Sequence, residues 1–127
     1  MLNGIESMTT ATLALALDAA TLRHQAIANN IANVNTEGYA QQALNFEGQL
    51  TQARRSLRER GQVDPFALAD VQLRLEPVVM ADGQLAKVQL DDEMAHLAQN
   101  TVQYQALTKA VSRHLAILSA AASDGKK

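Results

Sequence analysis

Residues 13–34, LALALDAATLRHQAIANNIANV, decide the fold of this chain. Within them, apolar positions recur at alternating steps of four and three residues, which is the spacing of a coiled-coil seam. The seam runs through Leu13, Leu17, Ala20, His24, Ile27, Ile31 and Val34. Met8, Leu15 and Leu22 form a second apolar line on another side of the same helix. A helix with two apolar stripes, expected over about residues 6–35, requires more than one neighbour.

The last part of the chain, residues 91–122, repeats this pattern. Its seam positions are Met94, Leu97, Thr101, Tyr104, Thr108, Val111, Leu115 and Leu118. Because two helical patterns of similar length lie at opposite ends of the chain, we expect an antiparallel pair in which the two seams pack together. Asp91, Asp92 and Glu93 stand at the start of the second pattern, where carboxylates cap free N–H groups. We assign these three acids to capping.

A polar middle segment separates the two helical patterns. A short helix is expected over residues 50–60, between breakers at Gly48 and Gly61. Residues 71–75 alternate apolar and polar side chains, and Asp82-Gly83 makes a tight turn, so a small β-hairpin is expected there. The predicted fold class is therefore mainly α, with a small extended or β-hairpin segment between two long paired helices. The expected parts are residues 1–39, 40–87 and 88–127.

The composition limits the functions that this chain can have. Its 127 residues allow one domain, and alanine supplies much of the apolar content, which predicts a thin core. The net charge of −2 lacks the basic excess typical of nucleic-acid-binding proteins, so no nucleic acid is expected as a partner. Cysteine is absent. Asp18 interrupts the first apolar stretch and Arg23 is the first basic residue, so no cleaved secretory signal is expected.

No motif predicts catalysis or a bound cofactor. His24, His96 and His114 lie far apart in sequence and lack partners at metal-ligand spacing. The three adjacent acids at residues 91–93 point in different directions on a helix, which does not suit an acid/base pair. Gly-rich phosphate loops are missing from the sequence. We therefore expect no enzyme activity, metal, cofactor or small-molecule substrate.

The basic cluster has two interpretations. It consists of Arg54, Arg55, Arg58 and Arg60. A solvated helix face is the default. The alternative is a contact patch for an acidic surface on a neighbouring subunit, because arginine suits ion pairs at interfaces.

Residues 28–39, ANNIANVNTEGY, put several asparagines at the end of the first helix. Asparagine is a weak helix former because its amide competes for backbone hydrogen bonds. A turn in which Gly38 takes a positive φ explains Asn35, Thr36 and Gly38. It does not explain Asn29 and Asn30, which lie inside the helix. Amides packed between helices can fix their register, so we expect Asn29, Asn30, Asn33, Asn35, Thr36, Gly38 and Tyr39 to set the turn and the register between subunits.

The same stretch resembles the N-terminal signature of the bacterial flagellar axial proteins, which form the rod, the hook and the hook-associated parts. The matching residues are Ala28, Asn30, Ile31, Ala32, Asn33, Asn35, Thr36, Gly38 and Tyr39. Glu37 stands where many members of that family have proline. The C-terminal stretch VQLDDEMAHLAQNTVQYQALTKAVSRHLAIL is similar to the proximal rod proteins, with Glu93, Met94, Asn100, Tyr104 and Gln105 at the family's positions. Both ends match and the middle matches poorly, so the resemblance covers about half of the chain.

The resemblance implies a structural subunit of the proximal rod. Such proteins pass unfolded through the type III export channel without a cleaved signal and polymerise in the periplasm. Their terminal helices form the inner tube, and the middle segment lies outside. The implied partners are copies of this chain, other rod proteins, and membrane-ring and export-gate components at the rod base. The alternative function is a free-standing helical binding module, such as an export chaperone or adaptor, which would fold alone.

Overall fold

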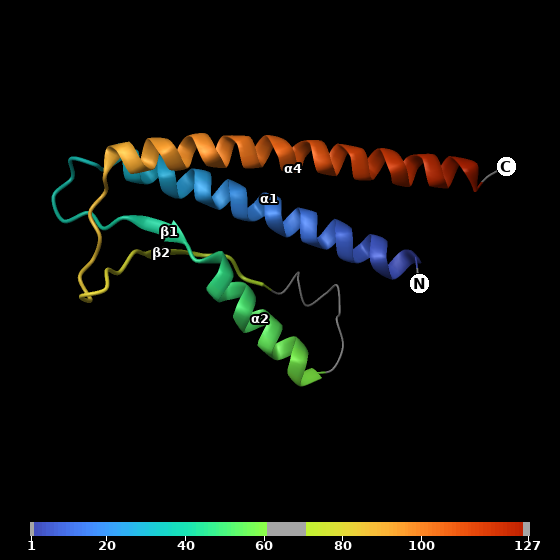
Figure 1. Cartoon of the computed structure of the whole chain (residues 1–127), viewed down its shortest axis with the longest axis horizontal. Helices are drawn as coiled ribbons and strands as arrows, with labels where there is room; N and C mark the ends of the chain where they lie inside the picture. The colour runs from blue at the N-terminus through green and yellow to red at the C-terminus, as the bar shows by residue number, and fades with distance from the viewer. Residues whose placement is uncertain (1, 61–70, 126–127) are drawn as a thin grey trace.

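The computed structural model describes residues 2–60 and 71–125. Its elements, in chain order, are α1 (Leu2–Ala32), β1 (Gln42–Leu44), α2 (Phe46–Arg60), β2 (Leu75–Pro77) and α4 (Leu90–Asp124). The two long helices run antiparallel and lie side by side, with the strands on one side of the pair (Figure 1). The predicted fold class is therefore confirmed, with a mainly helical chain and a small antiparallel sheet in the middle.

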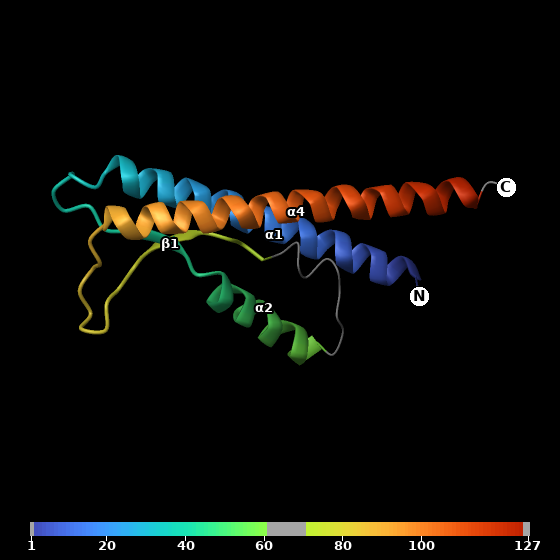
Figure 2. The same cartoon turned by 45° about the horizontal axis from the view of Figure 1, so that its top comes forward.

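The helix pair is close at one end and open at the other. α1 and α4 meet where α1 ends and α4 begins, and they separate toward the two chain termini (Figures 1 and 2). α1 ends at Ala32, about one turn before the end expected from the apolar pattern, and the chain then turns through residues 33–38. The junction of the two helices with the middle segment is thus the most closely packed region.

Apolar burial is small, and it comes mainly from α1. In the described part of the chain, the buried apolar residues are Leu15, Ala19, Ala20, Ala26 and Ile27. All five lie on α1, and three of them are alanine. Since alanine buries little area, this core contributes little hydrophobic stabilisation per residue. The two buried residues of α4 are Glu93 and Asn100, which are both polar.

The α4 residues that face α1 form a line different from the expected seam. The buried and half-buried positions of α4 are Glu93, Leu97, Asn100, Leu107, Val111, His114 and Leu118. Leu97, Val111 and Leu118 belong to the expected seam, whereas Met94, Tyr104 and Leu115 are 51%, 45% and 55% exposed. On α1, Ile27 is buried, and Leu13, Leu17 and Ile31 are half-buried; Val34, in the turn after α1, is also half-buried. Glu93, Asn100 and His114, which have hydrogen-bond partners in the chain, are therefore buried or half-buried. Met94, Tyr104 and Leu115, which the apolar pattern places in the seam, are exposed instead.

The small sheet joins two segments that are distant in sequence. β1 pairs with β2 in antiparallel register, with Gln42 opposite Pro77 and Leu44 opposite Leu75. The expected turn at Asp82-Gly83 is present, and Gly83 has a φ of +83°. Val79 and Leu85 form a single bridge on either side of this turn. The hairpin is therefore short, and the main partner of β2 is the segment that follows the asparagine motif.

α2 begins earlier than the apolar pattern predicted. Asn45 caps its first turn, because the backbone N–H of Gly48 donates to Asn45 Oδ1 at 3.1 Å. Gln49 is buried and bonds both backbone groups of Arg74, at 3.0 and 3.3 Å. These contacts attach the start of α2 to the segment before β2. The rest of α2 projects away from the helix pair (Figure 1).

A tight turn connects α1 to the middle segment. The backbone N–H of Thr36 donates to Asn33 O at 3.0 Å, and that of Tyr39 donates to Thr36 O at 3.2 Å. Gly38 has a φ of +77°, which side chains with a Cβ rarely adopt. A Cβ on Gly38 would meet nothing within 4 Å. Glycine is therefore required here by backbone conformation and not by space.

Gly38→Val is expected to lower the free energy of unfolding by about 1–2 kcal/mol, because a β-branched residue is strained at positive φ. Gly38→Asn is the matched control, since asparagine tolerates this region. Urea unfolding of both variants, followed by circular dichroism, measures the difference. In cells, Gly38→Val should reduce motility while the polypeptide is still expressed. Equal stabilities of the two variants would contradict a requirement for positive φ.

Candidate functional site

Asn30 lies in the last turn of α1 and joins three separate parts of the chain. It is 1% exposed. Its Nδ2 donates to Gln42 O at 2.8 Å and to Glu93 Oε2 at 3.2 Å. Its Oδ1 accepts from the backbone N–H of Gln42 at 2.9 Å and from the Tyr39 hydroxyl at 3.4 Å. All the hydrogen-bonding capacity of this amide is therefore used inside the chain.

The bonds between Asn30 and Gln42 imitate those of a neighbouring strand. A side-chain amide carries the same N–H and C=O groups as a peptide bond, so it can pair with both backbone groups of one residue. Gln42 begins β1, and it faces Pro77 of β2 only on its other side. Asn30 thus satisfies backbone groups that burial would otherwise leave without partners. Asn30, at the end of α1, therefore makes the hydrogen bonds with Gln42 that a third strand would make at this edge of β1.

Glu93 completes the site from α4. Its carboxylate is 1% exposed, and its Oε1 accepts from Gln41 Nε2 at 2.7 Å. His96 Nδ1 lies 3.8 Å from the same oxygen. The N-cap of α4 is Gln89, which makes no side-chain capping bond. The assignment of Glu93 to capping was therefore wrong: its carboxylate binds two amides, which offset the cost of burying it.

The other residues of the motif divide into an engaged and an exposed group. Asn33 Nδ2 donates to Asn29 O at 2.8 Å, and Asn33 Oδ1 accepts from the Thr36 hydroxyl at 3.2 Å. Tyr39 is half-buried against Asn30. The side chains of Asn29 and Asn35 are exposed. Asn30, Asn33, Thr36 and Tyr39 thus make hydrogen bonds within the chain, and the role of the motif between subunits stays a prediction.

A hollow beside Asn30 is lined mainly by polar side chains. It lies between α1, β1 and α4 and has a volume of about 350 Å³. α1 contributes Arg23, Ala26 and Ile27 to its lining. Side-chain amides come from the segment around β1 and from α4; they belong to Gln41, Gln42, Gln99, Asn100 and Gln103. Sequence reasoning missed Gln41 and Gln42, since glutamine outside a periodic pattern gives no signal. Their position directly after the motif was the available hint.

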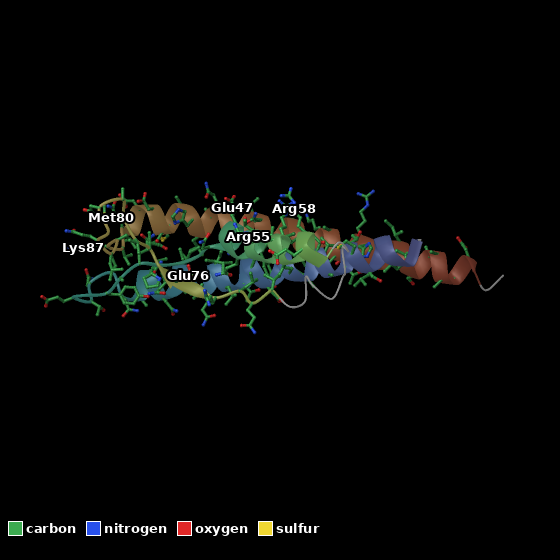
Figure 3. All side chains as sticks on the ribbon, turned by 90° about the horizontal axis from the view of Figure 1, so that it is seen from below. Glu47, Arg55, Arg58, Glu76, Met80 and Lys87 are labelled. Atoms are coloured by element: carbon green, nitrogen blue, oxygen red, sulfur yellow. The ribbon has the colours of Figure 1, made fainter. Side chains whose placement is uncertain are left out.

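The basic cluster lies apart from this site. Arg54, Arg55 and Arg58 are exposed on α2. Figure 3 labels Arg55 and Arg58 on this helix. The side chain of Arg60 lies outside the described residues. Arg23 is placed differently, because its guanidinium carbon lies 5.7 Å from the centre of the Phe46 ring and so connects α1 to the start of α2. The structure does not bring the cluster together with the asparagine motif.

The described part of the chain offers neither a metal site nor a membrane-spanning helix. Among residues 2–60 and 71–125, no three histidine or acidic side chains are grouped so that they could hold a metal ion. None of the helices in this same part is both long and apolar enough to cross a membrane. The site consists chemically of neutral amides around one carboxylate. Their hydrogen bonds can hold α1, β1 and α4 in fixed positions relative to one another.

Asn30→Leu should destabilise the chain although leucine is the better helix former. The backbone groups of Gln42 and the Glu93 carboxylate would lose a partner, at a cost of about 1–3 kcal/mol for each buried group left unpaired. Asn29→Leu, the exposed neighbour, is the control and should gain a few tenths of a kcal/mol. Thermal unfolding of both variants measures the difference. Equal melting temperatures would show that the Asn30 bonds contribute nothing to stability.

Comparisons with known proteins agree on one family. Residues 11–39 match the family model described as "Flagella basal body rod protein". The chain is also 30% identical over 116 residues to the flagellar basal body rod protein FlgB of Bacillus subtilis (strain 168). That match covers 87% of this chain and 90% of the relative. The family match includes Asn30 and the turn at residues 33–38. The chain therefore belongs to the flagellar basal body rod protein family, as a FlgB-like member.

Proposed function

We propose that this chain polymerises into the rod through α1 and α4. The supporting observation is the apolar surface that α4 leaves uncovered. Its large exposed side chains are 45–67% exposed and fall on two lines along the helix; Leu90, Met94, Tyr104 and Leu115 form one line, and Val102 and Ile117 lie on another side of α4. Monomeric proteins rarely leave large apolar side chains exposed over so long an element, and such surfaces usually mark interaction sites. Neighbouring subunits in a rod would cover them.

The small core points the same way. α1 contributes five buried apolar residues, and α4 contributes two buried polar residues in the described part of the chain. Ordering one residue costs about 1–2 kcal/mol, and alanine burial offsets little of that cost. Stabilisation from a neighbouring copy would make folding and assembly one coupled process.

We assign the parts of the chain to positions in the rod accordingly. Residues 1–39 and 88–127 would form the inner tube, and residues 40–87 would lie outside it. The strands and α2 lie on one side of the helix pair, which leaves its other side open to neighbours (Figure 1). The partners would be copies of this chain, other rod proteins, and membrane-ring and export-gate components at the rod base. The exposed arginines of α2 are available for an acidic neighbour.

The proposed role is structural and not catalytic. The chain would reach the periplasmic rod by type III export without a cleaved signal, and it would need no cofactor, nucleic acid or small-molecule substrate. This route suits a chain whose stability is supplied by its neighbours, because such a chain unfolds easily for passage through a channel.

Val102→Glu tests the uncovered face of α4. Val102 is 67% exposed, so the free energy of unfolding of the isolated chain should change by no more than about 0.5 kcal/mol. In the assembled rod the new carboxylate would be buried without a partner, which costs several kcal/mol and should block assembly. Val102→Leu keeps the surface apolar and should assemble. Motility and recovery of rods from cells give the readout, and normal rods with Val102→Glu would contradict an interface at this face.

Amide hydrogen exchange separates the rod subunit from a free-standing export chaperone or adaptor. At low concentration, we expect fast exchange over residues 6–35 and 91–122, because the second apolar stripe has no partner there. Protection should rise with concentration or on assembly. Strong protection that does not depend on concentration would favour the free-standing module.

A further inference from the structure

The α4 residues that face α1 include a heptad line that is mostly polar. Glu93, Asn100, Leu107 and His114 are each seven residues apart, so they fall on one line along the helix. Glu93 and Asn100 are buried, and Leu107 and His114 are half-buried. Three of the four positions are therefore polar at an interface that is apolar in an ordinary helix pair.

Each polar residue of this line has its own partner on α1. Glu93 accepts from Asn30, as described above. Asn100 is 4% exposed, and its Nδ2 donates to the backbone carbonyl of Ala20 at 2.9 Å. His114 Nε2 lies 3.0 Å from the Thr10 hydroxyl. The partners on α1 are thus spaced ten residues apart, at positions 30, 20 and 10.

The apolar contacts between the helices select only weakly among alternative alignments. The buried and half-buried alanines of α1 recur along the helix, at Ala11, Ala16, Ala19, Ala20 and Ala26, with Leu15 and Ile27 among them. On α4, leucine and valine recur in the same way, at Leu97, Leu107, Val111 and Leu118. Sliding α4 by one heptad would therefore again place apolar side chains of one helix against apolar side chains of the other. The polar bonds have no such equivalents, because each needs a particular partner.

We infer that the polar line fixes the register of α4 against α1, and that Asn100 is the residue that positions the middle of the pair. Its Oδ1 is buried and has no hydrogen-bond partner in the described part of the chain. A group of this kind lowers stability, and a buried asparagine at such a position is known to select one register at that cost. Asn100 therefore contributes alignment at the expense of stability.

This inference concerns the fold of the single chain and does not rest on the proposed function. It has a consequence for any surface that the pair presents. A slip of one heptad moves α4 by about 10 Å along α1, at 1.5 Å per residue. The exposed face of α4 would move by the same distance relative to the strands and α2.

The test measures distances between the two helices in the full-length chain. The sequence has no cysteine, so cysteines at the exposed positions Gln25 and Ala110 can carry spin labels without further changes. Labelled chain is diluted into unlabelled chain of the same variant, at a total concentration at which amide exchange of α1 and α4 is slow, and double electron–electron resonance gives the distribution of distances within one chain. Circular dichroism on the same samples gives the helix content. The variants are Asn100→Leu, Asn100→Asp and, as control for an exposed amide of α4, Gln105→Leu.

The unmodified chain and Gln105→Leu should each show one narrow distance. Asn100→Leu should keep or raise the helix content and yet show several distances, displaced by up to about 10 Å. Asn100→Asp keeps the shape but cannot donate to the Ala20 carbonyl, so the narrow distance should also be lost. A single unchanged distance in either Asn100 variant would overturn the inference. Loss of helix content in Asn100→Leu would also overturn it, because Asn100 would then be a stabilising residue and not a register device.

Discussion

The fold depends on the pairing of one side-chain amide with the backbone of one residue. Asn30 holds both the N–H and the C=O of Gln42, and this fixes how the middle segment leaves the helix pair. With β1 held by Asn30, β2 can pair with β1. The Asn30 amide also donates to the Glu93 carboxylate, which attaches the start of α4 to the same place. The turn at Gly38 serves this arrangement, because it returns the chain toward the helix that it has just left. A family signature at the end of a helix thus has a physical cause inside the single chain.

The interface between the helices places polar residues at buried positions among apolar ones. α4 turns its carboxylate and amide toward α1 and leaves Val102 and Ile117 exposed. Burial of a polar group is tolerated where it is hydrogen-bonded, and it is specific because the partner must be in one place. Apolar surface left outside is tolerated where another molecule covers it. The isolated chain therefore has a well-defined arrangement with little hydrophobic burial to stabilise it.

The sequence predicted the architecture because that part rests on periodicity. Leu13 to Val34 and Leu97 to Leu118 show the helical spacing plainly, and the turns at Gly38 and Asp82-Gly83 follow from local chemistry. It did not predict which line of α4 is buried, because Met94 and Leu115 are more apolar than Glu93 and His114, and only their partners on α1 reverse that order. The pairing of β1 with β2 was also missed, since three-residue strands give no pattern. Within the site, Asn30 was singled out, whereas the roles of its partners Gln42 and Glu93, and of Gln41 beside Glu93, required the tertiary structure.

The hydrogen bonds between α1 and α4 also determine when the two helices can pair during folding. Asn30 and Glu93 are 63 residues apart, Ala20 and Asn100 are 80 apart, and Thr10 and His114 are 104 apart. When the N-terminus emerges first during synthesis, none of these bonds can form before Glu93 has been made, and the last of them requires His114. Contacts this distant in sequence form late and slowly, because the whole intervening loop must be closed first. The chain is therefore kept open by its own topology until nearly all of it is present.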